Sequence, residues 1–339
     1  MMNLLCIGNA MVDVFAEVPE DFCKRFGLDS PVQHVGSELT SAILSALPED
    51  KIISSGGGAA NTAKIASRLG LSVAFTGAAG SDTFADFFKE ELELEGVSLH
   101  LVRKKSPTGL FISLASKSPQ EISEKHSITI AASPSAALEL DAEDLDEEMF
   151  ANQSSMPMKP GAGSICVIEG FLLNRERLLG RILELVNKYH LTLALDPGTS
   201  EIAQEQAQLI LQNHSPFWDS KNRCSLFPLI LFFNEAEAEN FAKTLLSDWE
   251  NLFISVSRDT SVLPIVKLAE RGAAVFSGGK VYYAKAEKVN AVESTGAGDA
   301  FAAGFLTAWL QGKSPEQCGQ AGNTAAALVL KAPGTILPG

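Results

Sequence analysis

The sequence predicts an α/β fold with a mostly parallel central sheet and a second, smaller β-sheet. Short apolar runs closed by polar residues or glycine alternate with longer helical stretches, which is typical of strands buried between helices. Two other runs alternate apolar and polar residues, as strands with one exposed face do. The 339 residues, 46% of them hydrophobic, suffice for one large core with a smaller appendage.

The apolar runs give the order of the main strands along the chain. They cover residues 4–7, 73–76, 165–168, 192–195, 229–233, 265–268 and 274–276. Helical patterns lie at residues 61–69, 83–95, 175–188, 235–246 and 299–310. Because these runs are apolar on both faces, we expect helices on both sides of the sheet.

The alternating runs predict the smaller sheet. Residues 110–114 and 127–131, joined by a polar loop, are expected to form an antiparallel hairpin that residues 12–18 extend. We therefore expect a main domain of residues 1–11, 41–99 and 132–339, and a β lid of residues 12–40 and 100–131. The lid should lie over the carboxyl ends of the main strands, where open α/β sheets bind ligands. Residues 215–228 lack periodicity and predict a surface loop.

Composition and charge narrow the class of protein. The chain has 27 basic and 41 acidic residues, a net charge of 27 − 41 = −14, which disfavours nucleic acid and anionic membrane partners. No apolar run approaches the roughly 18 to 20 residues of a membrane-spanning helix. The five widely spaced cysteines indicate neither disulfides nor a zinc site, and the amino terminus lacks a secretory pattern, so we expect a cytoplasmic protein.

The strongest motif is Gly296-Ala297-Gly298-Asp299, at the start of a predicted helix. Glycines at a helix start let the backbone approach an anion, while unpaired N–H groups and the helix dipole attract it. Asp299 would then lie beside a bound phosphate, where it could accept a proton from a hydroxyl. The alternative is an ordinary aspartate at the start of a core helix.

A second glycine motif precedes another predicted helix. Gly56, Gly57 and Gly58 run into an alanine-rich stretch that contains Asn61. Such a backbone can approach a ligand closely, and an asparagine side chain both donates and accepts hydrogen bonds, as polyol recognition requires. The alternative is a flexible turn followed by a packed helix.

Two familiar nucleotide motifs are excluded. Gly312-Lys313-Ser314 ends like a P-loop, but threonine occupies position 307, where its first glycine belongs. Gly8-Asn9-Ala10, after the first strand, lacks the further glycines of a dinucleotide site, which disfavours a nicotinamide enzyme.

The glycine blocks at residues 56–70 and 295–304 resemble the two signature segments of the ribokinase/PfkB carbohydrate kinase family, in the same order and separation. Residues 7–13 and 26–36 are most similar to bacterial members described as sugar kinases or adenosine kinase-like proteins. The resemblance covers residues 4 to about 335. It implies a ribokinase-like three-layer αβα domain with a small β-sheet lid, and ATP and Mg²⁺ as cofactors.

The resemblance also implies roles for residues around the acceptor. Asp299 would be the general base, and Gly296, Ala297 and Gly298 would form the anion hole for the transferred γ-phosphoryl group. The positions that match the family's acceptor side are Asp13, Gly57, Gly58, Asn61 and Glu169. For the two carboxylates Asp13 and Glu169, the alternative is an exposed residue at a strand end.

On the nucleotide side, the resemblance implies roles for Lys267, Gly272 and Asn323, and for Asn234 and Glu237 of an N-x-x-E motif near magnesium. The chain departs from the family at two places. Lys267-Leu268-Ala269 replaces the usual Thr-Leu-Gly, which makes Lys267 itself a candidate phosphate ligand, and Glu293 replaces an aspartate, which leaves dependence on a monovalent cation open.

Three functions remain in competition. The first is an ATP-dependent kinase that phosphorylates a primary hydroxyl of a sugar or sugar-like molecule, and the second is an adenosine (nucleoside) kinase. The third is a catalytically silent sensor of nucleotide or sugar on the same fold, against which the complete Gly296 to Asp299 motif argues. The expected partner is a small molecule rather than nucleic acid or membrane, and a homodimer through the lid is left open.

Overall fold

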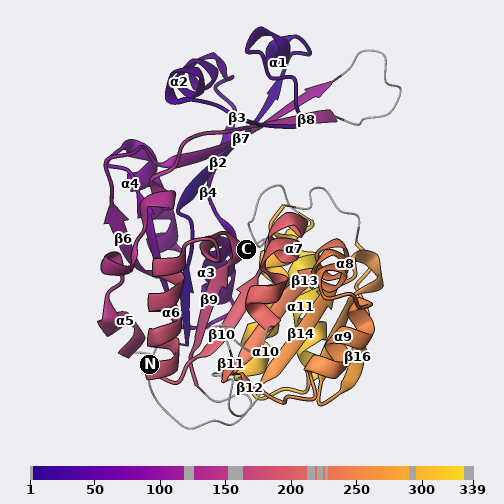
Figure 1. Cartoon of the computed structure of the whole chain (residues 1–339). Coiled ribbons are helices and arrows are strands. Elements are labelled where there is room, and N and C mark those ends of the chain that lie inside the picture. Colours follow the sequence, from indigo (N-terminus) through magenta and orange to yellow (C-terminus); the bar gives the residue numbers. More distant parts are fainter. Residues whose placement is uncertain are drawn as a thin grey trace.

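A large α/β body carries a smaller β-sheet that projects from it (Figure 1). The computed structural model describes residues 3–117, 126–151, 163–211, 218–219, 224–225, 228–289 and 295–331. Within them, no helix is long and apolar enough to cross a membrane.

The body is built on a nine-stranded sheet in the order β16-β15-β14-β13-β10-β9-β1-β5-β6. The strands are β1 (Leu4–Ile7), β5 (Val73–Ala79), β6 (Ser98–Arg103), β9 (Ile165–Glu169), β10 (Thr192–Asp196), β13 (Leu229–Asn234), β14 (Val262–Lys267), β15 (Ala273–Ser277) and β16 (Lys280–Ala284). Neighbours pair in parallel from β6 to β14, whereas β15 runs antiparallel to β14 and β16. The predicted mostly parallel sheet is confirmed.

Helices cover both faces of this sheet, because alternate side chains of each strand enter different cores. Leu4 and Cys6 of β1 belong to one core, and Leu5 and Ile7 to the other. The first core is closed by α3 (Gly58–Arg68), α4 (Thr83–Leu94), α10 (Ala297–Leu310) and α11 (Pro315–Val329). The second is closed by α5 (Glu147–Ala151), α6 (Glu176–Lys188), α7 (Ser200–Leu211), α8 (Glu235–Thr244) and α9 (Trp249–Val256). The body is thus the expected three-layer αβα arrangement.

The smaller sheet has five strands in the order β3-β8-β7-β2-β4. They are β2 (Met11–Val18), β3 (Val32–His34), β4 (Ile52–Gly56), β7 (Gly109–Lys117) and β8 (His126–Ala132). The predicted antiparallel hairpin is confirmed as β7 and β8, and β2 pairs with β7 in parallel. One face of the sheet is apolar and packs with Phe22 of α1 (Phe22–Arg25) and Ile43 of α2 (Ser37–Ala46).

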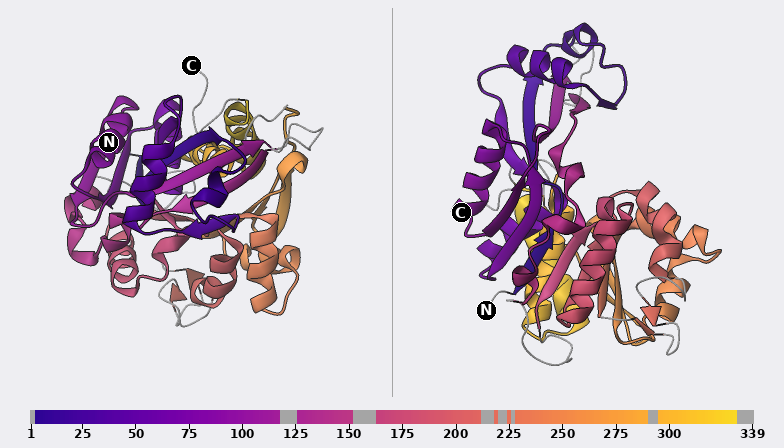
Figure 2. Two further views of the ribbon diagram at one scale, coloured as in Figure 1. Left: turned by 90° about the horizontal axis from the view of Figure 1, so that it is seen from above. Right: turned by 60° about the vertical axis from the view of Figure 1, so that its left-hand side comes forward.

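The small sheet leaves the body at the carboxyl end of β1, because β2 begins four residues after β1 ends at Ile7. Its strands reach away from the body in two views taken from different sides (Figure 1; Figure 2, right). The carboxyl ends of the parallel strands therefore lie near the point where the small sheet joins the body.

The two sheets divide the chain differently from the expected domain boundaries. Residues 98–103 form β6 at the edge of the large sheet, so the expected lid boundary at residue 100 is wrong, and the small sheet resumes only at β7. An edge strand is half exposed, which made this segment resemble a lid strand. Conversely, β4 was expected in the main domain and pairs with β2. Its residues Ser54 and Ser55 interrupt the apolar pattern that marks the other strands.

Four short 3₁₀ helices connect the described elements: η1 (Ala136–Glu139), η2 (Ala142–Asp144), η3 (Gly170–Leu172) and η4 (Ala269–Arg271). Of the predicted surface loop at residues 215–228, β11 (Trp218–Asp219) and β12 (Cys224–Ser225) form a short antiparallel pair. Most of the rest of that loop lies outside the described residues.

Candidate active site

Four polar residues lie at the carboxyl ends of four neighbouring strands of the large sheet. Glu169 ends β9, Asp196 ends β10, Asn234 ends β13 and Lys267 ends β14. The sheet register pairs Asp196 with Glu169 and Asn234 with Lys267. Because parallel strands end at the same edge of a sheet, these side chains gather where α/β sheets bind ligands.

The first turn of α10 lies beside this group, next to Lys267. Gly296, which precedes the helix, has a φ of +74°, a left-handed conformation that glycine adopts without strain. No side chain caps the helix start. The N–H groups of Ala297, Gly298 and Asp299 therefore have no partner within the helix and can bind an anion.

Asp299 is held in place by α3. Its Oδ2 atom accepts a hydrogen bond from Asn61 Nδ2 at 3.0 Å, and the Thr62 hydroxyl lies 3.5 Å from its backbone carbonyl oxygen. Although the residue is partly accessible to solvent, desolvation by the surrounding protein raises the pKa of Asp299 to about 7. The bond from Asn61 and the charge of Lys267 lower the pKa, and Asp196 and Glu169 raise it. A carboxylate with a pKa near the working pH is suited to general-base catalysis.

Lys267 supplies the positive charge of the site. Its Nζ atom lies 2.6 Å from Asp196 Oδ2. A Cβ atom at position 298 would lie 3.2 Å from the same Nζ atom. Burial lowers the pKa of Lys267, but the charges of Asp196, Glu237 and Asp299 outweigh burial and raise it overall. The ammonium group therefore stays protonated beside the first turn of α10.

The glycine loop before α3 passes close to three other groups. A Cβ atom at position 56 would lie 2.3 Å from Asp13 Oδ1, and one at position 58 would lie 3.3 Å from Asp299 Oδ1. Gly57 has a φ of +98°, and a Cβ atom there would lie 2.2 Å from the Asn9 carbonyl oxygen. The loop therefore connects Asp13 of the small sheet to Asp299 of the body, and its glycines are needed for these close approaches.

Asn61 has one unused hydrogen-bonding atom. The residue is 4% exposed, and its Oδ1 atom has no hydrogen-bond partner among the residues that the structure describes. Buried polar atoms are almost always paired, so an unpaired acceptor next to Asp299 suits a ligand that brings a hydroxyl donor.

Glu169 uses both carboxylate oxygens on the backbone. Oε1 accepts from the Asn9 N–H at 2.9 Å, and Oε2 accepts from the Ala59 N–H at 3.3 Å. The residue is 7% exposed, so it is not the exposed carboxylate of the alternative interpretation. Burial raises the pKa of Glu169 to about 7, although the two N–H groups and Arg175 lower it.

Asn234 and Glu237 form a capping box at the start of α8. Asn234 Oδ1 accepts from the Glu237 N–H at 2.9 Å, and Glu237 Oε2 accepts from the Asn234 N–H at 2.7 Å. Glu237 is 3% exposed, and burial together with Asp196 raises its pKa. The motif thus has a clear structural role in beginning the helix.

Comparisons with known proteins identify the family of the chain. The model of the pfkB family carbohydrate kinases matches residues 47–156 and 194–338, which is more than half of the chain. The chain belongs to the pfkB family. Its members are phosphotransferases that use an alcohol group as acceptor, as the glycine motifs led us to expect.

Relatives of the chain include both sugar and nucleoside kinases. It is 27% identical over 285 residues to a ribokinase of Haemophilus influenzae, covering 81% of each chain. It is 25% identical over 368 residues to an adenosine kinase of Saccharomyces cerevisiae, covering 99% of this chain and 96% of that one. Among solved structures, a probable sugar kinase from Rhizobium etli has a TM-score of 0.77 at 23% identity, covering 98% of this chain and 94% of that one, which shows the common fold.

Two residues to which the pfkB resemblance assigned a role at the nucleotide, Gly272 and Asn323, lie against the backbone at the end of β16. Gly272 has a φ of +97°, and a Cβ atom there would lie 2.0 Å from the Ala284 carbonyl oxygen. Asn323 Nδ2 donates to the carbonyl oxygens of Ala284 and Lys285, both at 3.1 Å. Both residues therefore shape the segment that leads out of β16 toward residues 290–294, which lie outside the described residues and include Glu293.

Sequence analysis missed Asp196. It directly follows the apolar run at residues 192–195, as Glu169 follows the run at 165–168, so its position at a strand end was the available signal. The structure brings together Asp13, the glycine loop, Asn61, Glu169, Asp299 and Lys267, and adds Asp196 as the partner of Lys267.

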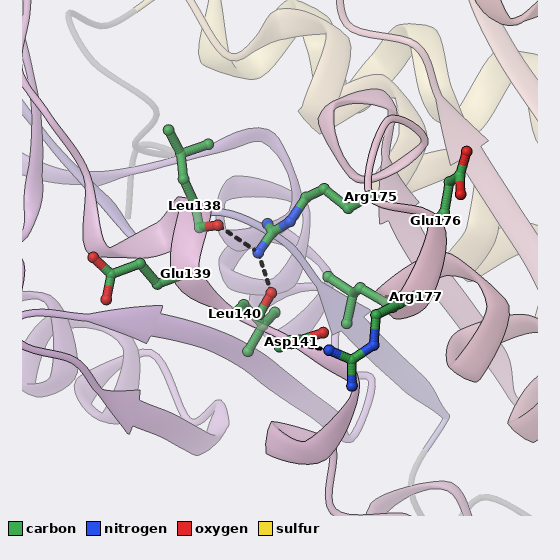
Figure 3. Close-up of a pocket in the computed structure, with 8 residues that line it drawn as sticks. Leu138, Glu139, Leu140, Asp141, Arg175, Glu176 and Arg177 are labelled. Carbon is green, nitrogen blue, oxygen red and sulfur yellow. Dashed lines mark hydrogen bonds and ion pairs between the residues drawn. The ribbon is translucent and has the colours of Figure 1, made fainter.

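A separate cavity of about 530 Å³ lies at the start of α6. It is lined by Leu138, Glu139, Leu140, Asp141, Arg175, Glu176, Arg177 and Leu178, none of which belongs to the candidate site of this pfkB protein. Figure 3 shows the Arg175 guanidinium reaching the carbonyl oxygens of Leu138 and Leu140. Arg175 thus fastens the segment around η1 to the chain that follows β9.

Proposed function

We propose that this protein transfers the γ-phosphoryl group of ATP to a primary hydroxyl of a sugar or nucleoside, with Asp299 as general base. The observation that carries the proposal is the setting of Asp299. Its carboxylate accepts a hydrogen bond from Asn61, and burial raises its pKa to about 7. The residue lies in the first turn of α10, whose backbone N–H groups have no partner within the helix. A proton acceptor and an anion-binding backbone therefore lie side by side, as phosphoryl transfer requires.

In this mechanism Asp13 and Asn61 bind hydroxyl groups of the acceptor, and Gly57 and Gly58 let it approach closely. Asp299 takes the proton of the primary hydroxyl as its oxygen bonds to the γ-phosphorus. The bond from that phosphorus to the bridging oxygen breaks, and ADP leaves with the electron pair. The N–H groups of Ala297 and Gly298 stabilise the charge on the transferred group.

The residues around Lys267 suit a hydrated magnesium ion. In the described ranges, no three His, Cys, Asp or Glu side chains are arranged to hold a metal. Asp196 and Glu237 nevertheless offer two hard carboxylates, and Mg²⁺ usually combines one or two of these with water and phosphate oxygens. When bound, the ion would neutralise negative charge on the triphosphate. Lys267 adds a fixed positive charge on the same side.

The acceptor side gives a reason to keep a nucleoside as the second candidate. In the small sheet Phe111 is the register partner of Asp13, and Phe15 lies two residues further along the same face. Both rings are partly exposed. Aromatic side chains beside a hydroxyl-binding carboxylate favour an acceptor that combines a sugar with an apolar ring, as adenosine does.

A screen of ATP consumption tests the proposal. Pentoses, hexoses, keto-sugar acids and nucleosides are offered separately with ATP and Mg²⁺, and the phosphorylated product is identified by mass and by ³¹P NMR. We expect at least one acceptor to accelerate ADP formation above the level of an Asp299→Asn control. If none does, a nucleotide or sugar sensor on the same fold becomes the better explanation.

A further inference from the structure

In the described part of the chain, four connections join the body to the small sheet: residues 8–10, residue 57, residues 104–108 and residues 133–135. Carboxylates bind two of them directly, the first and the third. Asp82 accepts hydrogen bonds from the N–H and the hydroxyl of Thr108, at 2.8 and 2.7 Å. Glu169 is bound to the first connection and to the helix that follows the second. Unlike Asp82, Glu169 belongs to the candidate site.

The contacts of Glu169 join two segments that are far apart in sequence. Asn9, whose N–H binds Oε1, lies in the turn that leaves β1 for the small sheet. Ala59, whose N–H binds Oε2, lies in the first turn of α3, directly after the chain returns from the small sheet through Gly57. One carboxylate therefore binds both the segment that leaves the body, residues 8–10, and the segment that returns to it, residues 57–59. We call these two segments the hinge.

The backbone packs closely around this carboxylate. A Cβ atom at position 8 would lie 2.7 Å from Glu169 Oε2 and 2.6 Å from Ala59 Cβ. A Cβ atom at position 170 would lie 2.2 Å from the Pro197 carbonyl oxygen, so the backbone after Glu169 rests on the chain that follows β10. The turn at Gly8, the start of α3 and the end of β9 meet at one tightly packed point.

We propose that Glu169 is a positioning residue that sets the angle at which the small sheet presents Asp13 to Asp299. The hinge segment at Asn9 leads within four residues to Asp13, whereas the helix that begins beside Ala59 carries Asn61, which binds Asp299. Loosening either bond to Glu169 lets Asp13 move relative to Asn61 and Asp299. The effect on the acceptor rests on the proposed function, whereas the effect on the hinge does not.

Hydrogen exchange measured by mass spectrometry tests the hinge directly. Glu169→Gln keeps the size of the side chain but turns one acceptor into a donor that faces an N–H group. We expect exchange in peptides covering residues 6–12 and 57–63 to be at least about tenfold faster than in the wild type, since one or both charged hydrogen bonds are lost. Asp248→Ala, which removes the side chain that caps α9 through the Glu250 N–H, is the control for general destabilisation.

Kinetics then separate positioning from mere support of the fold. With adenosine or ribose, whichever the screen finds to be phosphorylated, Glu169→Gln should raise the acceptor KM about tenfold or more. The affinity of the Glu169→Gln variant for a non-hydrolysable ATP analogue should stay within about threefold of the wild-type value. A threefold change is the limit because it is well below the effect of one lost charged hydrogen bond. Gly8→Ala, which forces the turn away from Glu169 without changing a charge, should give the same pattern and serves if Glu169→Gln does not fold.

The proposal is overturned if exchange in both peptides is unchanged, or if it rises equally across the chain as expected of the Asp248→Ala control. It is also overturned if the hinge loosens while acceptor KM stays at the wild-type value, or if ATP-analogue binding weakens equally. If the wild type phosphorylates no acceptor, the proposed function fails, and exchange alone decides the role of Glu169 in the hinge.

Discussion

Asp299, the proposed base, shows how surroundings move the pKa of an ordinary carboxyl group toward neutral pH. Asn61 on α3 donates one hydrogen bond to its carboxylate, and burial raises the pKa of Asp299 to about 7. Sequence analysis could single out the residue because the glycines before it indicate a helix start suited to an anion, and the structure places Asp299 in the first turn of α10. It could not predict the pKa, because Glu169, Asp196 and Lys267 come from three strands that are distant in sequence.

The first prediction concerns this base. Asp299→Asn keeps the shape of the side chain and should fold normally, but it should lower turnover about 10²- to 10⁴-fold, the usual contribution of a general base. Because the base acts when deprotonated, wild-type kcat should rise with pH through about 7 and level off above it. Steady-state rates from pH 5.5 to 9 measure both effects. Wild-type turnover in a folded variant would remove Asp299 from the mechanism.

A second prediction follows from the charge of Lys267. The ammonium group lowers the pKa of Asp299, so Lys267→Met should move the rising limb of the pH profile to higher pH. It should also raise the KM for ATP more than that for the acceptor, since the charge lies beside the first turn of α10. Lys267→Arg should restore part of both effects, and Lys280→Met, at an exposed position, is the control. An unchanged profile in Lys267→Met contradicts the assignment.

A third prediction separates the acceptor from the nucleotide. Asp13 lies against Gly56 on the small sheet, so Asp13→Ala should raise the acceptor KM by the equivalent of about 1 to 3 kcal/mol, the range for a lost hydrogen bond to a charged group. The KM for ATP should change little. Equal increases in both constants, measured with the acceptor found by the screen, would place Asp13 outside the acceptor site.

At the scale of the element, the turn between β4 and α3 shows why local sequence could indicate the glycine loop but not the strand before it. Three successive glycines are visible in the sequence, and each meets a different neighbour. The strand before them was missed because two of its five residues are serines and it pairs with β2, about 40 residues away. Pairing partners, rather than periodicity, made this segment a strand.

The fourth prediction concerns this turn. Gly27 and Gly57 both have positive φ, but a Cβ atom at position 27 meets nothing within 4 Å, whereas one at position 57 would lie 2.2 Å from the Asn9 carbonyl oxygen. Gly27→Ala should therefore lower the free energy of unfolding by about 1 kcal/mol through backbone strain alone. Gly57→Ala should lower it by about 3 kcal/mol, because a steric clash is added. Urea unfolding measures the difference, and equal losses would mean that the turn can relax.

For the whole molecule, alternating and apolar runs were enough to predict two sheets with different surroundings, and this part of the fold is confirmed. They were not enough to place the boundary between the sheets. The half-exposed edge strand β6 and the serine-containing β4 each have the residue pattern of the other sheet. Assignment of such strands depends on hydrogen bonds to partners that no local window contains.

The fifth prediction concerns the motion of the small sheet as a whole. We expect it to be more mobile than the body when no acceptor is bound, and to close when acceptor and nucleotide exclude water from the γ-phosphoryl group. Small-angle X-ray scattering should show a smaller radius of gyration with acceptor and an ATP analogue than without ligands. Hydrogen exchange should slow more in residues 11–18 and 109–117 than in β9 or β10. An unchanged radius and unchanged exchange would show that the small sheet is fixed.

The central place of β1 also matters while the protein is being made. Of the nine strands of the large sheet, β1 leaves the ribosome first, yet it lies between β5 and β9, and its Leu4 is the register partner of both Val73 and Ile165. One of its hydrogen-bonding edges therefore stays open throughout the synthesis of the small sheet and of η1 and η2. Open strand edges recruit other chains, so we expect nascent molecules to depend on chaperones until Ile165 emerges. The yield of folded enzyme in a cell then depends on how quickly this stretch is translated.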